Sequence, residues 1–191
     1  MGAILFFQEI HKNVYLGREE FFGHIEEQLK HLHSLKDDRA LVLVGALLVE
    51  YYLDELLSSY IPDYKNQLSR WTLFVKTTIA RALKLCPDYL YDSIDTIREI
   101  RNKFAHNLDV KNIEDLSNEY IKSLKSHLNQ YLTGPVYESI INDVKKVRIF
   151  DALIGNVTVT LRSYGLQIQV LNDFIRSDEI YEILNRKVAS E

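Results

Sequence analysis

The segment from Arg39 to Ser59 constrains the fold most, because apolar side chains cover nearly all sides of a helix formed by these residues. Its apolar positions are Leu41, Val42, Leu43, Val44, Leu47, Leu48, Val49, Leu53, Leu56 and Leu57. A helix that is apolar all round needs cover on every side, so the segment predicts the central helix of a bundle. The chain of 191 residues has only 3 Pro and 7 Gly, too few for the many turns of a β-sandwich or barrel. The sequence therefore predicts an all-α fold.

Apolar residues at three- and four-residue spacing predict further helices on both sides of this segment. Asp37 and Asp88 stand where they can cap the helices that follow them. The expected helices span Arg18–Leu35, Arg39–Ser59, Leu68–Leu83, Asp88–Asn107, Ile113–Leu132 and Val136–Ile154. We predict a helical bundle of about six helices in one domain. This domain covers residues 1–191, with its motif-bearing core at about 39–107 and a short helix over 173–188.

Residues 157–170 fit two different structures. Val157–Leu161 and Leu166–Val170 alternate apolar and polar residues around a central Arg-Ser-Tyr-Gly, as in a β-hairpin. Ile154, Val157 and Leu161 also fit a helix that continues from residue 136. The sequence leaves open a small hairpin near 157–170 or a longer helix.

The charges are distributed unevenly along an acidic chain. The formal net charge is −4, yet residues 64–106 carry eight basic and four acidic side chains. A basic middle segment indicates either a surface that faces an anion or a chance cluster of solvated charges. The single cysteine, Cys86, excludes an internal disulfide, and no uncharged run approaches the length of a membrane span. We therefore expect a cytoplasmic protein without membrane contact.

No set of residues has the full pattern of a metal or cofactor site. Glu20, His24, Glu27 and His31 follow one another at a spacing that could hold a metal on one helix face. No further ligand pair accompanies them, and the chain has no Gly-rich phosphate loop or Ser-His-Asp set. We predict that the protein uses neither a metal nor a cofactor.

Residues 97–107 form the one segment whose pattern is typical of chemistry. At about 100° per residue, Arg98, Asn102 and His106 form a polar ridge along successive turns of a helix. Arg101 falls instead in the apolar arc that includes Ile97. The helix therefore presents a row of polar side chains and one arginine on its apolar side.

The position of Arg101 leaves two interpretations open. A guanidinium stays charged when it is buried, so it needs a carboxylate or an anionic ligand beside it. The structural interpretation is a buried ion pair with Glu50 or Asp54 of the central helix. The functional interpretation is a phosphate held in a shared cleft. We predict that Arg101 is substantially buried and contacts one of these two carboxylates.

The sequence R-N-x-x-A-H over residues 101–106 resembles the R-x-x-x-x-H signature of the HEPN superfamily. These proteins are helical bundles that include many metal-independent ribonucleases. The resemblance implies that two protomers pair so that both signatures face one cleft and one RNA. It also implies that His106 acts as general acid or base and that Arg101 stabilises the charged phosphorane.

The neighbours of these two residues extend the candidate site. Asn102, one turn from His106, is the candidate orienting or phosphate-binding residue, and Arg98 and Lys103 are candidate phosphate contacts. Residues five positions apart on a regular helix lie about 140° apart, so Arg101 and His106 of one chain do not converge on one phosphate. Either the helix distorts near its end or a second protomer completes the site. We predict a homodimer that forms through this helix.

A wider stretch resembles the mannitol operon repressor family. The matching residues are Arg39–Leu48 with the acidic Glu50, Asp54 and Glu55, followed by Ile97–His106. This resemblance implies a non-enzymatic regulator of transcription that works through a protein partner and in which Arg101 and His106 are structural. No basic recognition helix is evident, so direct binding to duplex DNA is not expected. The alternatives are RNA binding or cleavage by a homodimer, regulation through a partner protein, and a plain interaction module.

Overall fold

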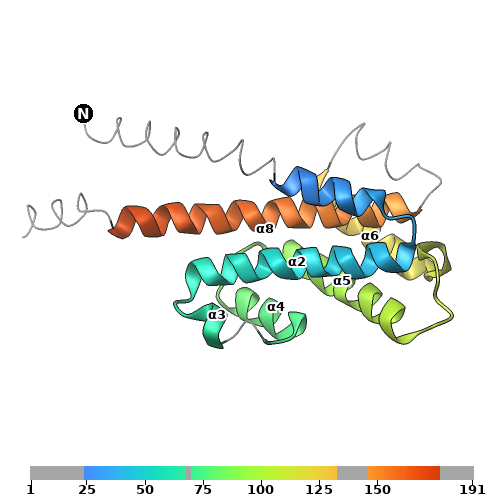
Figure 1. Cartoon of the computed structure of the whole chain (residues 1–191), viewed down its shortest axis with the longest axis horizontal. Helices are drawn as coiled ribbons and strands as arrows, with labels where there is room; N and C mark the ends of the chain where they lie inside the picture. The colour runs from blue at the N-terminus through green and yellow to red at the C-terminus, as the bar shows by residue number, and fades with distance from the viewer. Residues whose placement is uncertain (1–23, 68–69, 133–145, 177–191) are drawn as a thin grey trace, which may run out of the picture.

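The computed structural model describes residues 24–67, 70–132 and 146–176, and within these residues every regular element is a helix. After a helix over residues 24–34, the elements are α2 (Asp38–Tyr60), α3 (Tyr64–Gln67), α4 (Leu73–Ala82), α5 (Asp88–His106), a short 3-10 helix (Ile113–Asp115), α6 (Asn118–Tyr131) and α8 (Lys146–Arg176). Figure 1 shows α2 and α8 side by side, with the short α3 and α4 near one end of α2. The prediction of an all-α helical bundle is confirmed.

α2 contacts most of the bundle, in keeping with its apolar sequence. Asp37 caps its first turn by accepting hydrogen bonds from the N–H groups of Arg39 and Ala40, both at 3.3 Å. The helix then contacts α8, α5 and α4. Leu47 and Tyr51 are nevertheless exposed. The expected cover on all sides is therefore incomplete among the described residues.

α8 occupies the region for which the sequence allowed a hairpin. The chain is helical from Lys146 to Arg176, so the prediction of a small β-hairpin at 157–170 is wrong, and the alternative of a helix through these residues is confirmed. The expected beginning of this helix at residue 136 lies outside the described residues. Its fully buried side chains include Leu153, Ile154, Val157, Thr158 and Leu161. This is the spacing of a helix with one side packed along a neighbour. β-branched residues favour strands locally, but burial against α2 outweighs that preference.

Glycines allow α8 to lie close to α2. A Cβ atom at Gly45 of α2 would lie only 3.2 Å from the Ile154 side chain, and one at Gly165 of α8 would lie 3.6 Å from the backbone of Leu56. Glycine inside a helix costs about 1 kcal/mol relative to alanine. The tight contact with Ile154 explains the glycine at position 45, whereas a Cβ at position 165 would make only an ordinary van der Waals contact.

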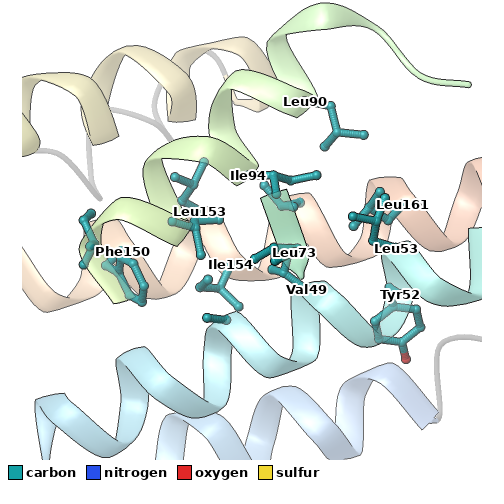
Figure 2. Packing of buried hydrophobic residues seen from close by; sticks show 14 of the residues in the cluster. Val49, Tyr52, Leu53, Leu73, Leu90, Ile94, Phe150, Leu153, Ile154 and Leu161 are labelled. Carbon is teal, nitrogen blue, oxygen red and sulfur yellow. The ribbon is translucent and has the colours of Figure 1, made fainter. Parts of the chain in front are cut away.

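The hydrophobic core lies where α2, α5 and α8 meet. Figure 2 shows Val49 and Leu53 of α2, Ile94 of α5, and Ile154 and Leu161 of α8 in this cluster. All five side chains are fully buried. Burying a large aliphatic side chain contributes about 1.5–3 kcal/mol, so these contacts hold α5, and the residues on its outer side, in a fixed position.

The third helix is shorter than predicted. It begins at Leu73 rather than Leu68, because Thr72 Oγ1 accepts a hydrogen bond from the Val75 N–H and caps the helix there. Parts of three other expected helices lie outside the described residues, namely 18–23, 136–145 and 177–188.

Two further boundaries differ from the prediction. α5 begins with Asp88 as its first helical residue, and Pro87 stands in the N-cap position, so Asp88 is not the cap. The expected helix over residues 113–132 divides into the 3-10 helix and α6, with Ser117 as the residue before α6. Among the described helices, none combines the length and apolar character that a membrane span requires.

Candidate functional site

The candidate site residues lie toward the C-terminal end of α5. The buried side of this helix consists of Leu90, Tyr91, Ser93, Ile94, Ile97, Ile100 and Phe104. The helix stays regular up to His106, and the N–H of Asn107 closes it by donating to the Lys103 carbonyl at 2.9 Å. The helix distortion that would bring Arg101 and His106 of one chain together is therefore absent from α5.

Arg101 is exposed, and the prediction that it is buried against Glu50 or Asp54 is wrong. Its Nη1 atom donates a hydrogen bond to Asn102 Oδ1 at 3.1 Å. Leu108, just after the end of α5, is also exposed. The apolar arc of α5 is therefore covered along most of the helix but not at its end.

Arg101 is exposed because the neighbouring helix α4 does not extend far enough to cover it. This helix begins at Leu73, and Phe74 in its first turn meets Arg98, whose guanidinium carbon lies 5.3 Å from the centre of the Phe74 ring. Arg101 lies one turn further along α5, beyond the start of α4. The residue has the predicted position on its own helix, but no described element covers that position.

Lys76 of α4 pairs with the acidic residues that the prediction assigned to Arg101. Its ammonium nitrogen lies 2.7 Å from Glu50 Oε1 and 2.9 Å from Asp54 Oδ2, and its side chain is only 3% exposed. Burial disfavours the charge, but the hydrogen bonds to both carboxylates outweigh burial and raise the pKa of Lys76 above its ordinary value. The Tyr64 hydroxyl also donates to Asp54. The two carboxylates therefore belong to a structural cluster that joins α2, α3 and α4.

A surface pocket of about 360 Å³ lies beside His106. Its wall is formed by the end of α5, the residue after it, and the start of α6, through Glu99, Asn102, Lys103, His106, Asn107 and Tyr120. Three of the predicted site residues, Asn102, Lys103 and His106, thus come together. Arg101 is linked to them through its hydrogen bond to Asn102.

The two candidate phosphate contacts differ in their surroundings. Arg98 does not line the pocket; its Nε lies 3.4 Å from Asp95 Oδ1 and its guanidinium lies over the Phe74 ring. Lys103 is exposed and lines the pocket, and within the described ranges it forms neither a hydrogen bond nor an ion pair through its ammonium. Lys103 is therefore the better placed of the two to bind an anion.

The loop after α5 is fixed by residues at the start of α2. Arg39 Nη2 donates to the carbonyl oxygens of Asn107 at 3.1 Å and Val110 at 2.9 Å. Asp38 Oδ2 accepts from the Ile113 N–H at 2.8 Å. These contacts join residues 68 to 75 positions apart, so no local sequence pattern indicates them. They hold the part of the pocket wall that Asn107 provides.

The part of the chain that the structure describes contains no group of three His, Cys, Asp or Glu side chains that could hold a metal ion. The described residues thus form a helical bundle with a polar, partly cationic pocket at the end of one helix. No family model matches the chain, and no curated protein or solved structure matches it.

Proposed function

We propose that the protein is a metal-independent endoribonuclease that cuts single-stranded RNA as a homodimer, with Arg101, Asn102 and His106 in its site. The observation that carries the proposal is the exposure of Arg101 next to a pocket lined by Asn102 and His106. A guanidinium neutralised in the core would serve the fold alone. An exposed guanidinium can bind a phosphate whose ester bond an imidazole helps to break.

RNA itself supplies the nucleophile for a cut without metal. One imidazole takes the proton of the 2′-hydroxyl, the 2′ oxygen attacks the adjacent phosphorus, and the bond from phosphorus to the 5′ oxygen breaks. An imidazolium returns a proton to the leaving oxygen, so the products are a 2′,3′-cyclic phosphate and a 5′-hydroxyl. Arg101 stabilises the negative charge of the phosphorane, and Lys103 binds a neighbouring phosphate.

A second copy of the chain completes the proposed site. Arg101 and His106 lie about 140° apart around α5, and this helix is regular up to His106. A twofold axis beside α5 would bring the arginine of one copy and the histidine of the other to the same phosphate. Each dimer would then hold two such sites, and in each the single histidine that takes the proton from the 2′-hydroxyl can return it, as imidazolium, to the leaving oxygen.

The cytoplasm is the compartment that we propose. Burial raises the pKa of the Cys86 thiol to about 12, so the thiol stays protonated and unreactive at neutral pH. Oxidising compartments favour proteins whose cysteines form disulfides, and a single buried cysteine cannot form one within its own chain.

The test is incubation of the purified protein with a mixed pool of single-stranded RNA in the presence of EDTA. We expect cleavage, read by gel electrophoresis, because no step needs a metal. The same sequences made with 2′-deoxy nucleotides should stay intact because they lack the nucleophile. RNA that the wild-type protein leaves uncut contradicts the proposal and favours the regulator that acts through a protein partner.

A further inference from the structure

The pocket beside His106 contains polar groups that the cleavage step does not use. Its wall includes the Glu99 carboxylate, the Asn107 amide and the Tyr120 ring in addition to Asn102, Lys103 and His106, which are already assigned. A phosphate only accepts hydrogen bonds, so cationic and N–H groups suffice to bind it. A carboxylate in the wall therefore indicates a ligand that also donates.

The hydrogen bonds of the two amides leave their NH2 groups for such a ligand. Asn102 Oδ1 accepts from Arg101 Nη1 at 3.1 Å, and Asn107 Oδ1 accepts from the Asp109 N–H at 2.9 Å. Both partners can only donate, so each amide must use its oxygen there. The donors at the pocket wall include these two amide NH2 groups and the ammonium of Lys103, beside the Tyr120 hydroxyl and the His106 ring.

Glu99 supplies an acceptor and Tyr120 supplies an aromatic ring. Glu99 Oε1 lies 3.9 Å from Arg98 Nη2, which is too long for a hydrogen bond, so the carboxylate can accept from a ligand. Tyr120 is partly buried against the hydrophobic core and also lines the pocket. Its ring is therefore held in place at the wall.

We propose that this pocket binds the nucleobase next to the scissile phosphate and prefers guanine, a proposal that rests on the proposed cleavage of RNA. The base stacks on Tyr120, as unpaired bases do on aromatic side chains of RNA-binding proteins. The two oxygens of Glu99 accept from the adjacent N1–H and 2-amino groups of guanine. Adenine, cytosine and uracil lack this pair of donors. The NH2 group of Asn107 donates to the guanine carbonyl, and Lys103 keeps its contact with the neighbouring phosphate.

Binding of RNA analogues that resist cleavage tests the pocket. The probes are four fluorescent 2′-O-methyl tetranucleotides. Each has uridine at three positions and guanine, adenine, cytosine or uracil at the same central position. Anisotropy titrations with the full chain give the affinity for each tetramer. We expect the guanine tetramer to bind about tenfold more tightly than the others. Glu99→Gln should remove this advantage, and Tyr120→Leu should weaken all four tetramers about tenfold. Glu119→Gln, an exposed glutamate outside the pocket, should leave both unchanged.

Any of three results overturns the proposal. These are equal affinity for all four tetramers, a guanine advantage that survives Glu99→Gln, and no binding at all. Cleavage of unmodified RNA is measured separately, so the two proposals fail in different ways. Cutting that depends on His106 but not on base identity contradicts the guanine pocket alone. Guanine-selective binding without any cutting contradicts the ribonuclease alone.

Discussion

Replacing His106 with alanine is expected to lower the rate of RNA cleavage about 10²- to 10⁴-fold, because the group that transfers the proton is lost. His106 is exposed on the last turn of α5, so the substitution leaves no cavity. The free energy of unfolding should change by less than about 0.5 kcal/mol. Initial rates on a fluorescent RNA substrate and denaturant unfolding curves measure the two quantities.

His31 offers a matched control, because it is also an exposed histidine on a helix but does not line the pocket. The His31→Ala protein, purified in the same way, should cut RNA at the wild-type rate. Equal rates for wild type and His106→Ala would show that this imidazole does not take part in cleavage. A large loss of stability in His106→Ala would contradict its position on the surface.

Replacing Lys76 with methionine is expected to lower the free energy of unfolding by about 3 kcal/mol. The substitution keeps the aliphatic stem but removes the buried ammonium, which is the partner of Glu50 and Asp54. Both carboxylates are about a quarter exposed, at 28% and 27%, so water compensates for part of the loss. This places the effect at the lower end of the range for a broken buried ion pair. Chemical denaturation measures it.

An exposed lysine–glutamate pair provides the control. Lys30 Nζ lies 2.7 Å from Glu26 Oε1, but both side chains are mostly exposed, so Lys30→Met should change stability little. Adding Glu50→Gln to Lys76→Met should recover part of the lost stability, because it removes one unpaired charge. A Lys76→Met protein as stable as the wild type would contradict the structural role of the cluster.

Helices whose apolar pattern is complete within one segment could be predicted from the sequence. α2 and α5 begin and end within a residue of their expected bounds. In α2 the cap residue Asp37 agrees with the apolar spacing, whereas in α5 the apolar spacing alone gives the bounds, because Asp88 is not the cap. α8 could not be separated from a hairpin, since Val157–Thr160 are all β-branched and favour strands locally. Packing along α2, which places Ile154 against Gly45, decides between the two, and this contact is not visible in the local sequence.

In the candidate site too, some features follow from the sequence of α5 alone and others depend on helices that are distant in the sequence. Asn102 and His106 could be placed together from spacing alone, because rotation per residue on a helix is fixed. The exposure of Arg101 depends on where α4 begins, and Tyr120 joins the pocket from another helix. Neither fact follows from the residues of α5. The sequence therefore placed Asn102 and His106 on one side of the helix but did not indicate the surroundings of the site.

A complementation experiment tests the central claim, a ribonuclease site shared by two copies, most directly. Arg101→Ala and His106→Ala are each expected to be inactive, and the two proteins are mixed under conditions that let dimers exchange chains. Half of the dimers should then be mixed and contain one intact composite site, so cleavage should return to about a quarter of the wild-type rate. A mixture that stays as inactive as each variant alone, beside a wild type measured in parallel, would contradict the shared site.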